Sequence, residues 1–159
     1  IVTCTGYTSR ELFEIQKNRQ SNFILNVGGM GLTGSLAAGI AHQHNGKVFC
    51  VDGDAAILMH AGALTVTAQC DNLIHILLNN GMHESVGKNS TAKKDFDFKA
   101  LARASGYNTV ITCDSRTLDS VMKKAIKNNK STFIEIITDG ESATLSRPNI
   151  QLKKLKKNI

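Results

Sequence analysis

The chain has 159 residues, of which 42% are hydrophobic and 20% charged, and this composition is typical of one globular domain and excludes a largely disordered chain. No apolar run approaches the roughly 20 residues that a membrane-spanning helix needs. The net charge is +6, but five basic and no acidic residues lie within 147–159, and the rest of the chain carries 14 basic and 13 acidic residues, or +1. We therefore expect a basic C-terminal tail, and neither nucleic acid nor a membrane as a partner.

The first residue is not methionine, and strand-like sequence follows at once without a signal peptide, which indicates a fragment, a processed chain or a trimmed one. The four cysteines contain no C-x-x-C pair. We predict that they are reduced and structural, as in a cytoplasmic protein.

Apolar runs and helical periodicities alternate along the chain. In order, the pattern predicts a strand at 1–4, a helix at 9–18, a strand at 22–27, a helix at 33–44, a strand at 47–52 and a helix at 55–68. A strand at 72–78, a helix at 98–104, a strand at 109–113, a helix at 116–128 and a strand at 132–138 follow. Strands separated by helices pair in parallel through right-handed crossovers. The sequence therefore predicts a doubly wound α/β domain over 1–146, with a mainly six-stranded parallel sheet between two layers of helices, and a basic tail over 147–159.

A glycine-rich turn lies between the second strand and the second helix. Its spacing Gly29-x-Gly31-x-x-Gly34 fits a dinucleotide fingerprint, and Asp52 lies about where the ribose-binding acid of such a site is expected. Met30 inside the turn speaks against a dinucleotide site. A nicotinamide-dinucleotide binding module therefore stays open as an alternative.

Asp54 and Asn80 are the most informative polar pair. Asp54 follows the buried run 48–53, and Asn80 follows the run 73–79. The carboxyl ends of parallel strands are where open α/β sheets bind ligands. Carboxylate and amide oxygens suit Mg²⁺, while Gly53 and the start of the next helix suit a phosphate. The pair therefore predicts a magnesium-bridged diphosphate site, and the long loop 79–97 is expected to cover it.

These motifs resemble those of the thiamine diphosphate-dependent 2-oxo acid decarboxylases. Gly53-Asp54 with Asn79-Asn80 is similar to the cofactor signature of that family, and the turn 28–31 resembles its cofactor-clamping turn. Within the family the closer similarity is to the phosphonopyruvate decarboxylases. It rests on the segments 8–14, 51–54, 58–60, 72–76 and 78–87, whose motifs occur in the same order and spacing.

The resemblance implies a role for each matching residue. Mg²⁺ would be bound by Asp54, by the side chain of Asn80 and by the backbone carbonyl of Met82. The carbonyl of Gly28 would accept a hydrogen bond from the aminopyrimidine, and Met30 would hold the cofactor in its bent form. The cofactor-binding set that the resemblance implies is Gly28, Gly29, Met30, Gly53, Asp54, Ala55, Ala56, Asn80, Met82, His83, Glu84 and Ser85. The chain departs from the family pattern at Ala55 and at Gly29, where glycine and serine are more usual.

The implied reaction is decarboxylation of 3-phosphonopyruvate to phosphonoacetaldehyde and CO₂, a step in phosphonate biosynthesis. In this family the glutamate that activates the cofactor lies on a separate pyrimidine-binding domain, for which 159 residues leave no room. We therefore expect an inactive diphosphate-binding half that needs a pyrimidine-binding domain or subunit, within a homo- or hetero-oligomer.

His83 is a candidate for substrate contact or catalysis, or else packs on the diphosphate, whereas His60 is expected to be structural. Two further alternatives stay open. One is a subunit of a sulfopyruvate decarboxylase, whose substrate carries a sulfonate in place of the phosphonate. The other is a non-catalytic partner subunit.

Overall fold

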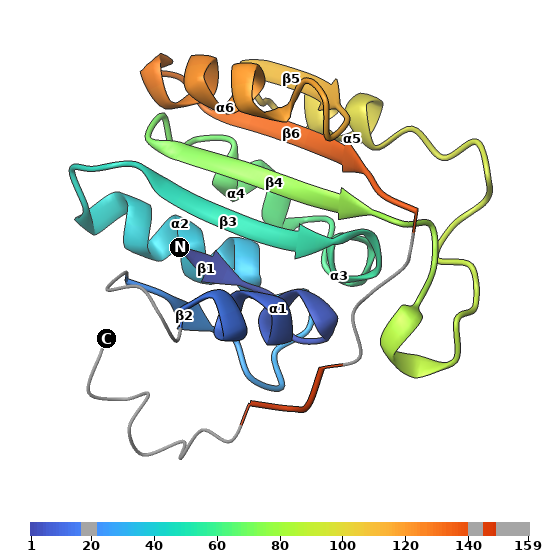
Figure 1. The fold of residues 1–159 in the computed structure, drawn as a ribbon. Helices are drawn as coiled ribbons and strands as arrows, with labels where there is room; N and C mark the ends of the chain where they lie inside the picture. The colour runs from blue at the N-terminus through green and yellow to red at the C-terminus, as the bar shows by residue number, and fades with distance from the viewer. Residues whose placement is uncertain (17–21, 140–144, 149–159) are drawn as a thin grey trace.

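The computed structural model describes residues 1–16, 22–139 and 145–148. Its centre is a six-stranded sheet with helices on both faces (Figure 1). The elements in chain order are β1 (Val2–Thr3), α1 (Tyr7–Gln16), β2 (Ile24–Leu25), α2 (Thr33–Gln43), β3 (Val48–Gly53), α3 (Asp54–Met59), α4 (Ala63–Thr67), β4 (Leu73–Asn79), the 3-10 helix η1 (Glu84–Val86), α5 (Phe98–Ala104), β5 (Thr109–Cys113), α6 (Leu118–Lys127) and β6 (Thr132–Ile137).

All the strand pairs are parallel, and the strand order is β2-β1-β3-β4-β6-β5. The chain runs outward from β1 to β2, then returns to the other side of β1 to add β3. The order therefore reverses between β1 and β3. In open α/β sheets, ligands bind beyond the carboxyl ends of the strands at such a switch point. The predicted doubly wound α/β fold is confirmed.

The two faces of the sheet have separate cores. On one face, buried side chains of α2 to α5 pack against alternate residues of β3 and β4, including Cys50, Leu73 and Leu77. On the other face, Ile74, Ile134 and Ile136 pack against α6, and α1 lies on this same side in Figure 1. Strands that are buried on both faces need apolar residues at almost every position, which is why their sequences are nearly continuous apolar runs.

The predicted helix over 55–68 is wrong in one respect, because it is two short helices. α3 ends at Met59, and His60, Ala61 and Gly62 form a turn before α4 begins. The glycine-rich turn before α2 packs against this break. A Cβ atom placed on Gly31 would lie 3.1 Å from the carbonyl oxygen of Ala56 and 3.2 Å from the Cβ atom of His60. The turn and the break thus lie in close contact, although they are distant in sequence.

Other bounds shift by a few residues. α1 begins at Tyr7, two residues earlier than predicted, and the predicted end of this helix lies outside the described residues. α6 begins two residues later than predicted, since the Asp114 carboxylate accepts hydrogen bonds from the backbone N–H groups of Arg116 and Thr117 and forms a turn there. The helix over 98–104 and the strand over 109–113 are found as predicted.

All four cysteines are free and buried, as predicted. Within the described part of the chain, no helix is both long and apolar enough to cross a membrane. Of the predicted basic tail, only 147 and 148 are among the described residues.

Candidate functional site: a cleft at the carboxyl ends of the strands

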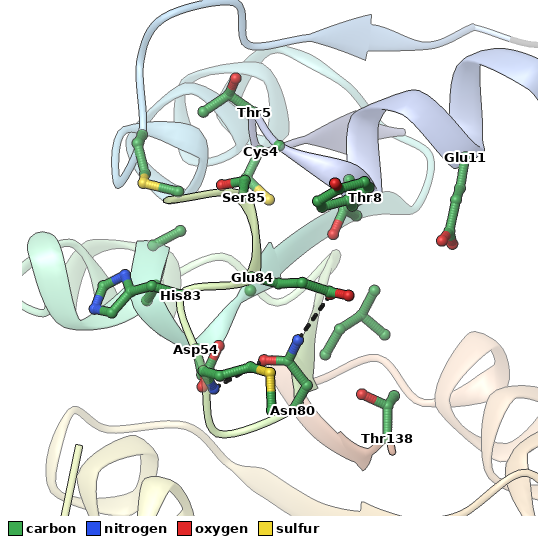
Figure 2. A pocket seen from close by; sticks show the side chains of 18 of the residues that line it. Cys4, Thr5, Thr8, Glu11, Asp54, Asn80, His83, Glu84, Ser85 and Thr138 are labelled. Carbon is green, nitrogen blue, oxygen red and sulfur yellow. Dashed lines mark hydrogen bonds between the residues drawn. The ribbon is translucent and has the colours of Figure 1, made fainter. Parts of the chain in front are cut away.

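A cleft of about 270 Å³ opens where β1, β3, β4 and β6 end (Figure 2). Its position is the switch point between β1 and β3. Its walls come from segments that are far apart in the sequence. The lining residues are Cys4, Thr5, Gly6, Tyr7, Thr8, Glu11, Met30, Gly53, Asp54, Ala55, Ala56, Leu78, Asn80, Met82, His83, Glu84, Ser85, Thr138 and Asp139. All the predicted cofactor-binding residues are in this set except Gly28 and Gly29.

Asp54 is the first residue of α3 and lies at the floor of the cleft with only 2% of its surface exposed. Its Oδ2 atom accepts a hydrogen bond of 2.5 Å from the Thr91 hydroxyl group. Charged side chains are rarely buried so deeply unless they are paired or coordinate a metal. No salt bridge to Asp54 is found among the described residues. The carboxylate is thus suited to a cation that enters from the cleft.

Asn80 follows β4 and lies beside Asp54 in the cleft (Figure 2). Its Oδ1 atom accepts a hydrogen bond of 3.1 Å from the backbone N–H of Met82, and its Nδ2 atom donates one of 3.1 Å to Glu84. The two bonds fix the amide, with its oxygen toward the loop and its nitrogen toward Glu84. The side chain therefore offers a hard oxygen donor of defined orientation.

The loop after Asn80 folds back on itself. Met82 and Ser90 form an isolated antiparallel bridge, and Thr91 donates its backbone N–H to the carbonyl of Gly81 at 3.1 Å. This return brings the Thr91 hydroxyl group to Asp54. The predicted irregular loop 79–97 is therefore partly structured, with η1 at its centre and its first residue, Asn79, inside β4.

The Nδ1 atom of His83 is buried and has no hydrogen-bond partner among the described residues. Burying a polar nitrogen without a partner costs free energy, so this atom is a candidate contact for a group that enters the cleft. His83 lines the cleft. His60, in contrast, is exposed in the turn between α3 and α4.

The wall opposite the Asn80 loop is built by the start of the chain, and it was not predicted from the sequence. Residues 4–6 connect β1 to α1, and Thr8 and Glu11 of α1 line the same cleft (Figure 2). Gly6 has φ = +102° and faces Ser85, whose Oγ atom would lie 3.7 Å from a Cβ atom placed on Gly6. Thr8 and Glu11 belong to the segment 8–14 that carries the family resemblance, but the resemblance assigns neither residue a role in the site.

Cys4 in this wall is not a reactive thiol. Burial, and then the negative charge of Asp52, raise the pKa of the Cys4 thiol to about 12. Because the thiolate is the nucleophilic form, Cys4 acts as a small apolar lining residue at neutral pH.

The glycine-rich turn reaches the cleft through Met30 alone. Gly28 and Gly31 have φ of +75° and +85°, which glycine adopts without strain. The Nδ2 atom of Asn26 donates a hydrogen bond of 2.6 Å to the carbonyl of Gly29, and a Cβ atom on Gly29 would lie 2.4 Å from the Oδ1 atom of Asn26. The Asn26 side chain therefore occupies the space that a serine at position 29 would need.

The geometry does not suit the dinucleotide alternative. Asp52, the candidate ribose-binding acid, is 3% exposed, and its Oδ2 atom lies 3.0 Å from the Nε2 atom of His75 in the core. A ribose-binding acid must reach a ligand at the edge of the sheet. Asp52 is instead enclosed beneath α2 and α4.

The fold and the cleft thus define a parallel α/β domain with a polar cleft at the switch point of its sheet. Residues 2–136 match the model of the family described as thiamine pyrophosphate enzyme, C-terminal TPP binding domain. The chain belongs to this family.

The curated relatives are named as decarboxylases. The chain is 37% identical over 155 residues to a phosphonopyruvate decarboxylase of Streptomyces hygroscopicus, in an alignment that covers 95% of this chain and 38% of the relative. It is 31% identical over 137 residues to a sulfopyruvate decarboxylase subunit beta of Methanocaldococcus jannaschii, covering 84% of this chain and 72% of that subunit. The chain therefore spans less than half the length of the first relative.

Solved structures show the same fold. A thiamine diphosphate-dependent 4-hydroxybenzoylformate decarboxylase of Rhodococcus jostii RHA1 aligns with a TM-score of 0.64 and 22% identity, over 79% of this chain and 26% of that one. At this level of identity the likeness concerns the fold.

Proposed function

We propose that the chain is the diphosphate-binding part of a thiamine diphosphate- and Mg²⁺-dependent decarboxylase that converts 3-phosphonopyruvate to phosphonoacetaldehyde and CO₂. The observation that carries the proposal is the pairing of a buried Asp54 with Asn80 at the ends of adjacent strands, in a chain whose family binds this cofactor. The 37% identity to a phosphonopyruvate decarboxylase supports the substrate.

The proposed metal ligands are the carboxylate of Asp54, the Oδ1 atom of Asn80 and the backbone carbonyl of Met82. The residues fit the ion, because Mg²⁺ prefers oxygen ligands and shares its octahedron with phosphate and water. In the structure, the Asn80 oxygen accepts the N–H of Met82, and the Met82 carbonyl accepts the N–H of Glu84 at 3.0 Å. Each oxygen therefore accepts one hydrogen bond and has a second lone pair that could bind a metal.

The cofactor's diphosphate would lie between two walls of the cleft. We assign it the backbone at Gly53, Ala55, Ala56 and 83–85. The side chain of Met30 and the carbonyl of Gly28 would hold the rest of the cofactor, with Gly29 as the link between them. Only small residues border α3 here, so the phosphate can approach the backbone closely, although Ala55 adds a methyl group that glycine would lack.

When bound, the cofactor supplies the carbanion that adds to the ketone and the electron sink that accepts the electron pair left by CO₂. This chain's own residues bind and orient it: the Asp54 and Asn80 oxygens fix the diphosphate end through the metal. His83 stands at the cleft with its buried Nδ1 atom available, and we propose that it contacts the substrate or the cofactor.

The chain alone should not turn over substrate. We assign the glutamate that activates the cofactor to a pyrimidine-binding domain or subunit outside this sequence, in a larger oligomer. Glu135 is buried in the sheet and Glu84 is bonded to Asn80, so neither is placed for that role. We also propose 1–146 as the domain and 147–159 as a basic C-terminal tail.

A second candidate is the beta subunit of a sulfopyruvate decarboxylase. The 72% coverage of the Methanocaldococcus jannaschii subunit favours it, because the matching region is most of that relative. The two substrates share the 2-oxo acid that reacts, and differ only in the tetrahedral anion at the far end.

The test is reconstitution. The chain is mixed with a pyrimidine-binding half taken from a phosphonopyruvate decarboxylase, then with thiamine diphosphate and Mg²⁺, and CO₂ release is followed from 3-phosphonopyruvate and sulfopyruvate in parallel. We expect turnover only in the complete mixture, with a higher kcat/KM for phosphonopyruvate. Lys130→Ala serves as a matched control, because Lys130 pairs with Asp71 on the exposed surface. A higher kcat/KM for sulfopyruvate would select the second candidate, and metal-independent binding of NAD without thiamine diphosphate binding would contradict both.

A further inference from the structure

The buried carboxylate of Glu135 has no part in the proposed binding of cofactor or metal, yet it is connected to the loop that carries two of the proposed ligands. Glu135 is the fourth residue of β6 and is 5% exposed. Its side chain lies beside those of β4 and β5, because Glu135 pairs in register with Leu77 on one side and with Thr112 on the other.

Two neutral groups hold this carboxylate. The Oε1 atom accepts a hydrogen bond of 2.8 Å from the Nδ2 atom of Asn79, and the Oε2 atom accepts one of 3.0 Å from the Thr112 hydroxyl group. Burying a carboxylate costs free energy unless hydrogen bonds offset the loss of its hydration. The bond to Asn79 crosses from β6 to the last residue of β4.

Asn79 passes the constraint on to the next turn. With its Nδ2 atom held by Glu135, its Oδ1 atom faces the chain beyond the strand and accepts the backbone N–H of Gly81 at 3.1 Å. Gly81 has φ = +71°, a left-handed conformation that turns the chain sharply. The turn places Asn80 and Met82 on either side of Gly81, and these are the residues that supply two of the three proposed metal oxygens.

We propose that Glu135 is a positioning residue for the metal site, and that it acts through Asn79. An amide can rotate by half a turn and exchange its oxygen and nitrogen. Because an acceptor-only carboxylate faces its nitrogen, Asn79 is fixed with its oxygen toward Gly81 N–H. The hydrogen-bonded series Glu135, Asn79, Gly81 therefore holds the turn in its conformation before an ion binds. Less conformational entropy is then lost when the ion binds. The inference rests on the proposed function only for its effect on the metal.

The first measurement needs no cofactor. Amide hydrogen exchange of the 159-residue chain is read residue by residue by NMR. We expect Glu135→Leu to accelerate exchange at Gly81 about fivefold, the effect of losing one ordinary hydrogen bond. Glu135→Gln should leave exchange near wild type, since its amide oxygen can accept from Asn79 and its nitrogen can donate to Thr112. Unchanged Gly81 exchange in Glu135→Leu would overturn the inference, whatever the chain binds.

The second measurement is Mg²⁺ affinity in the presence of thiamine diphosphate, by calorimetric titration. Loss of an outer partner of a metal ligand weakens binding by about 10–100-fold, and we expect about tenfold for Glu135→Leu. Asn79→Ala removes the middle residue of the same series, so it should give a similar loss of Mg²⁺ affinity, even if Glu135→Leu fails to fold. Thr112→Val is the matched control, because it removes the other hydrogen bond to the same carboxylate and should change the Mg²⁺ affinity less than about twofold.

A double-mutant cycle separates positioning from general weakening of the sheet. If the two residues act in series, Glu135→Leu with Asn79→Ala should bind Mg²⁺ about as well as Asn79→Ala alone. If the losses of Mg²⁺ affinity in the two single variants instead multiply in the double variant, the inference is overturned. It is also overturned if a Phe133→Leu variant, equally destabilised in the same strand, loses Mg²⁺ affinity to the same extent. If wild type binds no Mg²⁺ with the cofactor, the proposed function fails, and the Gly81 exchange still decides whether the series exists.

Discussion

Asp52 and Asp54 are two residues apart on one segment and almost equally buried, with 3% and 2% of their surface exposed. Their surroundings differ. Asp52 points into the core beneath α2 and α4, where the Nε2 atom of His75 lies 3.0 Å from its Oδ2 atom. Asp54 begins α3 at the floor of the cleft, where its bonded partner is the Thr91 hydroxyl group.

The core cluster is enclosed by protein groups, although the Oδ1 atom of Asp52 is buried without a hydrogen-bond partner among the described residues. The Nδ1 atom of His75 lies 2.7 Å from the Tyr107 hydroxyl group, which lies 2.6 Å from that of Thr67. The Cys50 thiol donates to Asp52 from the same strand at 3.5 Å. Asp52 thus has a histidine and a thiol of the core as partners, and it does not line the cleft. Asp54 lines the cleft and has a hydroxyl group of the Asn80 loop as a partner. Burial alone therefore does not distinguish the two acids, whereas their position relative to the cleft does.

The largest expected effect concerns the core cluster. His75→Leu removes the partner of a buried carboxylate, and breaking a buried pair in this way costs about 3–5 kcal/mol of unfolding free energy. Urea unfolding followed by circular dichroism measures the loss. The matched control is the double variant Asp52→Leu with His75→Leu, in which both polar groups are gone. It should recover most of the stability, and a double variant less stable than His75→Leu would show that the comparison is wrong.

Asp54→Ala should give the opposite result. We expect its unfolding free energy to change by less than about 1 kcal/mol, since one hydrogen bond from Thr91 is all that is replaced by water. Affinity for thiamine diphosphate with Mg²⁺ should fall about 100-fold or more. This loss should exceed the one caused by removing a residue that only hydrogen-bonds to a metal ligand. Titration calorimetry with and without Mg²⁺ measures the affinity. Thr91→Val keeps the carboxylate and should bind nearly as wild type, whereas undiminished affinity in Asp54→Ala would exclude Asp54 as a ligand.

Much of the fold followed from the sequence because strands buried on both faces leave a strong apolar pattern. The helix over 98–104 and the strand over 109–113 were predicted to the residue. The break at His60 was missed, and it lies against Gly31, which is remote in sequence. The apolar periodicity of a sequence indicates the type of an element, but it does not indicate where a distant segment contacts that element.

The same limit applies to the site. Asp54 and the loop after Asn80 stand at predictable strand ends, and the structure brings them together in one cleft. The opposite wall, with Cys4 and Glu11, was not predicted, because neither residue was assigned a role in the site and the two lie far from Asp54 in sequence. The side chain of Asn26, which fills the space beside Gly29, likewise becomes visible only in three dimensions.

Cys4 connects the two regions, and its titration should give the smallest of the three effects. It lines the cleft, yet the Asp52 charge, after burial, is a cause of the rise of its pKa from 9.0 to about 12. The folded chain therefore holds the thiol proton more tightly than the unfolded chain. The stabilisation is complete below pH 9 and is lost as pH rises from 9 toward 12, at about 1.4 kcal/mol per pH unit. Burial also raises the pKa values of Cys50 and Tyr107, which adds to the slope with the same sign.

Urea unfolding at pH 8, 9, 10 and 10.5, on wild type and Cys4→Ala, isolates the contribution of this one thiol. Cys4→Ala should shift stability by a constant amount below pH 9, then decline less steeply than wild type above it. In the double variant Asp52→Leu with His75→Leu the Asp52 charge is absent, so the Cys4 pKa should be lower. The contribution of Cys4 to the fall of unfolding free energy with pH should then end at a lower pH. Equal slopes for wild type and Cys4→Ala would mean that the Cys4 thiol ionises as readily in the folded chain as in the unfolded one. The wall of the cleft would then be electrostatically independent of the core cluster beneath it.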